Sequence, residues 1–333
     1  MEFAEEQGGN AAHMDEQFLT SQSVLFTSSP PKLVYTCREN KLEKNVLETF
    51  VQLNRDAETL EYLETYCSGK ESFLRSTMAH LANYFLSRTD SNALVGRGQM
   101  FVLSTAQIER LLSHGKPGNK GGPTAVLPGG KPFQRLLDIG AGDGTVTKHF
   151  SPLVKHITVT EVSTHMIKRL EGLPFVDRAC NTASLDPFPT GNESDHFDLI
   201  GLLNVLDRCH EPSTLLYEIR KRLVPSTGRL VLAVVLPFCP FVEDGTKQQT
   251  PSQDLNMNGG RCKEGASFEE SVNVLINNVL IPHGFIVHSW SRLPYICAGD
   301  ERQQYYVLSD AVFVLSHDGE LGEEREDELM GLE

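Results

Sequence analysis

Residues 136–144 read LLDIGAGDG, an apolar run that breaks into three glycines at alternate positions, among them Gly140 and Gly142. A glycine-rich turn between a strand and a helix lets bare backbone and a helix N-terminus lie against a ligand. The dinucleotide pattern Gly-x-Gly-x-x-Gly is excluded because position 145 is threonine, and a P-loop is excluded because no Gly-Lys-Ser/Thr follows. The turn, with Asp138 before it, therefore predicts a nucleotide-like ligand of another kind.

An acidic residue further along the chain strengthens this interpretation. A second strand is expected to end at Glu161, 23 residues after Asp138. A carboxylate at the tip of that strand can accept hydrogen bonds from both hydroxyls of a ribose, although an acid at a strand end is also a common solvated loop residue. Adenosine without a diphosphate fits both features, which points to S-adenosylmethionine as the cofactor.

The remainder of the chain alternates between expected strands and helices. Apolar runs predict strands at 135–139, 156–160, 175–179, 197–203 and 229–236, and helical periodicity predicts helices near 144–152, 163–172, 211–223 and 268–281. Two final apolar segments, 284–290 and 305–315, are close enough to pair as an antiparallel edge. The pattern predicts an α/β fold with a mostly parallel seven-stranded sheet. It resembles the Rossmann-like fold of class I S-adenosylmethionine-dependent methyltransferases.

The N-terminal third is expected to be helical, at 41–66, 71–86 and 104–113, with Ser104 as the N-cap of the last helix. Glycine and proline are concentrated directly after it. We therefore expect an acidic disordered tail (1–32), an N-terminal helical region (33–113) and a flexible connection (114–132). A methyltransferase domain (133–317) with a polar insertion (244–266) follows, and a second acidic disordered tail (318–333) ends the sequence.

The formal net charge of −14 is concentrated in the tails. Residues 1–20 hold five acids and no Lys or Arg, and residues 318–333 hold eight acids and one Arg, so the tails carry −12 and the rest about −2. We see no basic face for a nucleic acid, no apolar run of 18 residues and no signal peptide, so neither nucleic acid binding nor a membrane span is expected. Seven scattered cysteines without a Cys-x-x-Cys pair predict reduced thiols and no metal site.

A second group of polar residues follows the expected strand at 197–203, in the segment FDLIGLLNVLDRCHEP. Asn204, Asp207 and Arg208 stand at the carboxyl end of this strand, where ligands lie in open α/β sheets. A structural role for Asp207 stays open, because a helix is expected to begin near Glu211 and this acid could cap it.

Several blocks of the sequence closely resemble the DREV family, also called the methyltransferase-like protein 9 family. They are SRTDSNALVGRGQMFVLS, LLDIGAGDGTVTKHFSP, TEVSTHMI, LLNVLDRCHEPSTLL, GRLVLAVVLPFCPFVE, SRLPYICAGD and YYVLSDAVFVL, and the resemblance runs from about residue 84 to 315. Members of that family are protein-histidine N-pros-methyltransferases. The resemblance implies methyl transfer from S-adenosylmethionine to a ring nitrogen of histidine in His-x-His stretches of substrate proteins, where x is small.

Carried over by position, the resemblance implies cofactor contacts from Glu161, Asn204 and Tyr295, with the turn that begins at Asp138 around the methionine end of the cofactor. On sequence alone, Tyr295 is equally a core aromatic residue with a satisfied hydroxyl.

Asp207 and Tyr306 match positions that we assign to the substrate imidazole. Neutral imidazole has one donor and one acceptor nitrogen, and only the nitrogen with the lone pair can accept a methyl group. A carboxylate at Asp207 that accepts the far N–H would select the reactive tautomer and stabilise the imidazolium product. Tyr305 and Tyr306 are adjacent in a strand, so only one of them can line the site, and we assign Tyr306.

Two other functions stay open: a class I methyltransferase with another acceptor, such as a carboxylate or a small amine, and a catalytically silent methyltransferase-fold scaffold. The chain has no His-x-His pair of its own, so we expect no self-methylation at this motif and substrates that are other proteins. We also expect a monomer. Its acidic start differs from the apolar leader of the endomembrane-associated family members. The sequence therefore favours the cytoplasm, and the resemblance alone suggests the endoplasmic reticulum or another endomembrane.

Overall fold

The computed structural model describes residues 31–67, 99–114, 133–190, 195–244, 247–255, 257, 265–299 and 304–319. The expected helix at 71–86 lies outside these residues, as do nearly all of the connection at 114–132 and of both acidic tails, and part of the insertion at 244–266.

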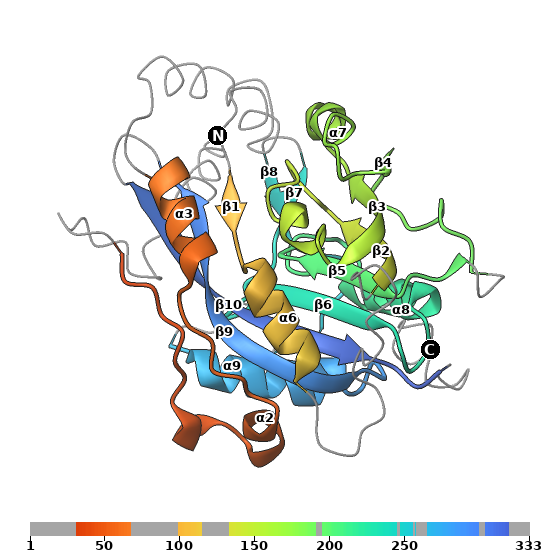
Figure 1. Ribbon diagram of the computed structural model, residues 1–333. Helices are drawn as coiled ribbons and strands as arrows, with labels where there is room; N and C mark the ends of the chain where they lie inside the picture. The colour runs from red at the N-terminus through yellow and green to blue at the C-terminus, as the bar shows by residue number, and fades with distance from the viewer. Residues whose placement is uncertain are drawn as a thin grey trace, which may run out of the picture.

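One eight-stranded sheet forms the centre of the molecule (Figure 1). In spatial order its strands are β1 (Met100–Phe101), β9 (Ile286–Ala298), β10 (Tyr305–Ser316), β6 (Arg229–Val235), β5 (Leu199–Leu203), β2 (Phe133–Ile139), β3 (Val154–Glu161) and β4 (Arg178–Asn181). Strands β6, β5, β2, β3 and β4 pair in parallel, whereas β10 pairs antiparallel with β6 and β9, and β1 antiparallel with β9. The α/β fold is confirmed, and the two-residue strand β1 adds an eighth strand to the seven expected.

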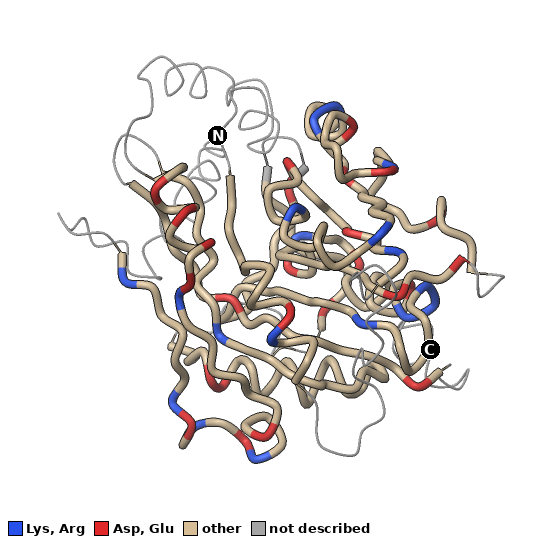
Figure 2. Tube along the Cα trace, viewed as in Figure 1, with Lys and Arg blue, Asp and Glu red and all other residues tan. Residues whose placement is uncertain are grey.

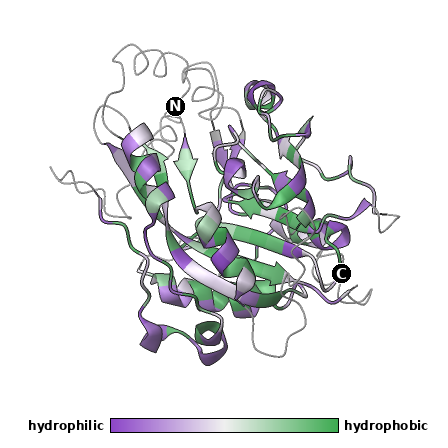
Figure 3. Ribbon diagram, viewed as in Figure 1, coloured by the Kyte–Doolittle hydropathy of each residue, from purple (hydrophilic) through white to green (hydrophobic). Residues whose placement is uncertain are grey.

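Apolar side chains cover both faces of this sheet. Leu136 and Leu199 belong to one buried cluster, and the next residues in sequence, Leu137 and Ile200, belong to another, because successive residues of a strand point to opposite faces. Burial on two sides explains why the central strands are continuous apolar runs, visible in green in Figure 3.

Helical segments connect the strands. They are η2 (Thr147–Phe150) after β2, α7 (Thr164–Leu170) after β3, α8 (Pro212–Arg222) after β5, and α9 (Phe268–Val274), which continues as the π-helix η4 (Leu275–Leu280). The segment after the glycine turn is thus a short 3-10 helix and not the longer helix expected at 144–152. Among the described residues, no helix has the length and apolar character needed to cross a bilayer.

Apart from the short 3-10 segment, the N-terminal helices pack on the sheet. They are η1 (Glu39–Lys41), α2 (Lys44–Glu48), α3 (Ala57–Tyr66) and α6 (Thr105–Ser113). Ser104 caps α6 as expected, since its hydroxyl accepts from the amide of Gln107 and the Gln107 side chain accepts from the amide of Ser104.

The single helical stripe expected at 41–66 is wrong, because an extended segment separates α2 from α3. Trp290 of β9 explains the break: its amide donates to the carbonyl of Thr49, and its carbonyl accepts from the amide of Val51. These backbone bonds to the sheet replace the helical bonds that the periodicity predicted. The Trp290 indole N–H also donates to the carbonyl of Val46, at 2.7 Å.

The cysteines do not all remain reduced thiols. Cys239 is disulfide-bonded, whereas Cys37, Cys67, Cys180, Cys209 and Cys297 are free. The expectation of uniformly reduced cysteines is therefore wrong at Cys239.

Two short strands lie around the start of the expected insertion. They are β7 (Val242–Asp244) and β8 (Lys247–Gln249), which pair antiparallel. Figure 2 shows basic and acidic positions interspersed along the described elements.

Candidate active site

The glycine turn leaves the carboxyl end of β2 in a left-handed conformation. Gly140, Gly142 and Gly144 all have positive φ, at 70°, 58° and 81°. A Cβ at Gly140 would lie 2.6 Å from Cγ2 of Val205, whereas a Cβ at Gly142 would meet nothing within 4 Å. The backbone therefore requires glycine at these positions, and Gly142 additionally leaves open space beside the turn.

Asp138 is buried at the end of β2. Its Oδ2 accepts a hydrogen bond from the Thr147 hydroxyl at 2.6 Å, and its Oδ1 has no hydrogen-bond partner among the described residues. Burial raises the pKa of Asp138 to about 7, although the Thr147 bond acts in the opposite direction. Gly201 on β5 makes room for this carboxyl, because a Cβ there would lie 2.8 Å from Oδ1.

Glu161 is the last residue of β3, and its carboxylate is hydrogen-bonded to the glycine turn. Its Oε2 accepts from the amide of Gly142 at 3.0 Å, and its Oε1 accepts from the amides of Val162 and Ser163 at 2.8 and 2.9 Å. A carboxylate offers about four acceptor positions, so three backbone amides leave room for one more donor. The contact of Glu161 with a ribose stays a prediction.

Asn204 follows β5 at a sharp bend. Its φ of 58° is left-handed, a conformation that asparagine tolerates better than most residues. The amide of Asn204 still donates to the carbonyl of Ala233 on β6, and its side-chain Nδ2 donates to Oδ2 of Asp310 at 2.8 Å. The side-chain Oδ1 has no partner among the described residues.

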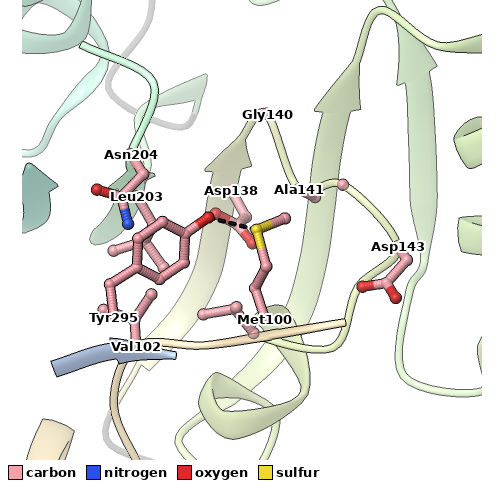
Figure 4. Close-up of a pocket in the computed structure, with 11 residues that line it drawn as sticks. Met100, Val102, Asp138, Gly140, Ala141, Asp143, Leu203, Asn204 and Tyr295 are labelled. Atoms are coloured by element: carbon pink, nitrogen blue, oxygen red, sulfur yellow. Dashed lines mark hydrogen bonds between the residues drawn. The ribbon is translucent and has the colours of Figure 1, made fainter. Parts of the chain in front are cut away.

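These strand ends surround a pocket that encloses about 410 Å³ of empty space continuous with the solvent (Figure 4). The residues that line it are Met100, Val102, Asp138, Gly140, Ala141, Gly142, Asp143, Val146, Leu203, Asn204 and Tyr295. The structure thus brings five of the six expected cofactor residues to one cavity, with Glu161 behind the glycine turn. Sequence reasoning missed Met100 and Val102, which the N-terminal region supplies to the pocket.

Tyr295 lies on the opposite side of the pocket from the glycine turn. Its hydroxyl donates to Sδ of Met100, which binds β9 to the neighbouring edge of the sheet (Figure 4). Burial raises the pKa of Tyr295 well above its ordinary value. This tyrosine is therefore a neutral donor over the physiological pH range.

Tyr306 shares a sheet face with Tyr295. In the β9–β10 ladder Tyr306 pairs with Cys297, and Tyr295 pairs with Leu308, so all four side chains are on one face. Tyr305 points to the other face, where it is buried and its hydroxyl donates to the carbonyl of Pro31 at 3.1 Å. Tyr306 is half-buried and does not line the pocket described above.

Asp207 lies three residues after Asn204; it is buried and does not line the pocket. Its Oδ2 lies 2.8 Å from a guanidinium nitrogen of Arg208, and its Oδ1 has no partner among the described residues. Burial raises the pKa of Asp207, against the opposing effect of Arg208, whose guanidinium also stacks on the ring of Phe241 at 3.8 Å. Glu211 is the N-cap residue of α8, so the helix-capping role considered for Asp207 is excluded.

The central strands are parallel, and their glycine turn and strand-tip polar groups surround one pocket. The antiparallel strands β9 and β10 complete the sheet. This is the architecture of a class I S-adenosylmethionine-dependent methyltransferase. The model of the DREV methyltransferase family matches residues 34–317. The chain therefore belongs to the DREV methyltransferase family, and S-adenosylmethionine is its cofactor.

Other comparisons gave weaker similarities. A highly reducing polyketide synthase, pspA of Penicillium soppii, is 37% identical over 128 residues, a match that covers 34% of this chain and 5% of the synthase. The chain thus spans only a small part of the length of that relative.

One solved structure that resembles the chain is the N-methyltransferase NodS of Bradyrhizobium japonicum WM9 in complex with S-adenosyl-L-homocysteine. The two chains are 17% identical, the match covers 55% of this chain and 78% of that chain, and the TM-score is 0.31. The YcgJ protein of Bacillus subtilis has 19% identity, coverages of 56% and 93%, and a TM-score of 0.34. These likenesses are distant, and the topology and the family match carry the assignment.

The pocket suits this cofactor chemically. Within the described part of the chain, Asp138 Oδ1 and Asn204 Oδ1 are buried acceptors without partners, and such atoms are expected to receive donors from a ligand. S-adenosylmethionine offers an ammonium group and ribose hydroxyls as donors. The open space at Gly142 would accommodate a ligand against the backbone, where any side chain would intrude.

Proposed function

We propose that this protein is a protein-histidine N-pros-methyltransferase that modifies His-x-His motifs of substrate proteins. The observation that carries the proposal is the buried Asp207 carboxyl at the end of β5, which keeps one oxygen, Oδ1, without a partner among the described residues. That atom is suited to accept the N–H of an imidazole. The resemblance of the motifs around Asp207 and Tyr306 to the DREV family supports the same acceptor.

We assign cofactor binding and orientation of the substrate imidazole to different residues. Asp138, Asn204, Tyr295 and the glycine turn would hold the cofactor, whose sulfonium centre supplies the methyl group. Asp207 would orient the substrate imidazole by accepting its far N–H, so that the lone pair of the other nitrogen faces the methyl group, and would stabilise the imidazolium that forms. Arg208 balances the charge of Asp207 when the site holds no imidazole.

The test is incubation of the full chain with labelled S-adenosylmethionine and a peptide containing Ala-His-Ala-His, compared with the same peptide lacking its second histidine. Mass spectrometry of the hydrolysed product separates the two ring isomers of methylhistidine. We expect the N-pros isomer and a strong preference for the paired motif. Label on a carboxylate or amine from a metabolite pool, with none on histidine, would instead support a different acceptor.

A catalytically silent scaffold is the alternative from another class. The glycine turn, Asp138 and Asn204 are arranged around an open pocket, which favours a working cofactor site. Calorimetric titration with S-adenosylmethionine together with the methyl-transfer assay separates the two, because a silent scaffold would transfer no methyl group to any acceptor, whether or not it binds the cofactor.

The compartment and the oligomeric state are also proposals. We propose a monomer. The sequence favours the cytoplasm, but the disulfide at Cys239 is typical of proteins in oxidising compartments such as the endoplasmic reticulum, the location that the family resemblance suggests. Fractionation of cells that express the tagged chain, with thiol labelling of Cys239, distinguishes the two.

A further inference from the structure

Asp310 is a buried acid that the sequence analysis did not single out. It lies within β10, where it is 0% exposed and pairs with Val235 on one side and Leu293 on the other. A carboxyl group in such apolar surroundings is unfavourable unless it is hydrogen-bonded. Its Oδ2 accepts from Nδ2 of Asn204 at 2.8 Å, and its Oδ1 has no partner among the described residues.

This hydrogen bond joins positions that are 106 residues apart in sequence. Asn204 belongs to the bend after β5, whereas Asp310 is two strands away in the sheet, on the face that carries Tyr295. A carboxamide can rotate by 180° and exchange its donor and acceptor ends. The bond to Asp310 opposes that rotation, because Oδ2 of Asp310 accepts from Nδ2 of Asn204 and Oδ1 of Asn204 then remains as the acceptor for a ligand.

We propose that Asp310 is a positioning residue of the cofactor site, which fixes the orientation of the Asn204 carboxamide at the pocket and acts on cofactor binding only through Asn204. The proposal concerns the cofactor and not the methyl acceptor, so it holds whichever acceptor the enzyme uses.

The surroundings of Asp310 disfavour its charged form. Burial raises the pKa of Asp310 well above its ordinary value, and the nearby Asp207 acts in the same direction, whereas the Asn204 bond and Arg208 oppose it. A carboxamide has nearly the shape of a carboxyl group and keeps an oxygen that can accept from Nδ2 of Asn204. Asparagine is therefore the conservative replacement for Asp310, and leucine is the replacement of similar size that cannot accept a hydrogen bond.

The experiment is calorimetric titration of S-adenosylmethionine into the full chain and into D310N, D310L, N204A and the double variant N204A/D310L. We expect D310N to bind within threefold of the unmodified protein and D310L to bind at least tenfold more weakly. In the N204A background, D310L should change the affinity by less than twofold, because the residue through which Asp310 acts is already gone. Ser316→Ala is the matched control, since it removes a partly buried hydrogen bond, to His288, six residues further along β10.

Three outcomes would overturn the proposal: normal cofactor affinity in folded D310L, a tenfold loss in D310N, or an equal loss from D310L with and without Asn204. If D310L fails to fold, as judged by its thermal unfolding, D310S replaces it in the same cycle, because serine is smaller and leaves Asn204 without its carboxyl partner. A protein that binds S-adenosylmethionine in this pattern but methylates no histidine peptide would confirm the role of Asp310 while rejecting the proposed acceptor.

Discussion

The carboxylate of Glu161 accepts a hydrogen bond from the backbone amide of Gly142 at 3.0 Å, and this bond joins the tip of β3 to the glycine turn that follows β2. The turn is left-handed at three positions, and Thr160 of β3 also holds it, because its carbonyl accepts from the amide of Ala141 at 3.0 Å and its hydroxyl accepts from the amide of Gly140 at 3.3 Å. Glu161 therefore shapes the pocket even though it does not line it.

Replacing Glu161 with alanine should weaken the binding of S-adenosylmethionine at least tenfold, because the amide of Gly142 loses its acceptor, the turn loses one of its supports and the expected ribose contact is removed. Calorimetric titration measures the effect. Glu171→Ala, an exposed acid just after α7, is the control and should bind normally. Unchanged affinity in E161A would refute both this support and the expected contact with the ribose.

Gly142→Ala tests the open space in the pocket. Any non-glycine residue at φ 58° is strained by about 1–2 kcal/mol, and an added methyl group would also intrude on the cofactor. Gly265 has a positive φ of 83° and equally open surroundings, yet it does not line the pocket. We expect G142A and G265A to lower the free energy of unfolding by similar amounts, and only G142A to weaken cofactor binding. Equal cofactor affinities in the two variants would show that Gly142 serves the backbone alone.

Asp207→Asn tests the proposed contact with the imidazole. The amide keeps the shape of the side chain but removes its negative charge, so methyl transfer to the His-x-His peptide should fall by about 10²–10⁴-fold while cofactor affinity stays within threefold. Single-turnover kinetics at saturating cofactor measure the first effect and calorimetry the second. Glu211→Gln, an exposed N-cap residue of α8 that makes no side-chain cap bond, should leave both unchanged. Loss of cofactor binding together with transfer would assign Asp207 a structural role.

Asp138 should make stability fall as the pH rises. Its pKa is about 7 in the folded protein and about 3.9 when unfolded, so between these values the folded state holds a proton that the unfolded state has released. Its contribution to stability is complete below about pH 4 and is lost by about pH 7, with a size of roughly 1–4 kcal/mol. Between pH 5 and pH 8, the free energy of unfolding measured in urea should decrease less in D138N than in the unmodified protein. In D186N, the exposed control, it should decrease as much as in the unmodified protein. Parallel pH dependences in all three proteins would contradict the raised pKa.

Much of the fold is predictable because its signals are local. The apolar runs of β2, β3, β5 and β6 mark buried strands by themselves, and the three glycines mark a turn that no other residue type adopts easily. The polar residues after β5 were predictable for the same reason, since they directly follow an apolar strand.

The remaining features depend on contacts between distant parts of the chain. Periodicity predicted one helical stripe at 41–66, but the backbone of Trp290 pairs with residues 49–51 and interrupts it. Strand β1 has two residues and is defined only by its pairing with β9. Asp310 lies in an apolar strand, and among the residues that the structure describes its side chain is bound by Asn204, 106 positions away in sequence.

The anchoring of Trp290 sets a lower limit on how far this enzyme can be shortened. The indole is 0% exposed, its N–H is satisfied by Val46, and Phe50 lies against its ring at 4.8 Å. Excising residues 31–67 would expose this aromatic surface to water and leave a buried donor unsatisfied on the strand that carries Tyr295. The helices that precede the glycine turn are therefore part of the catalytic fold, and a fragment that starts at β2 should aggregate instead of binding cofactor.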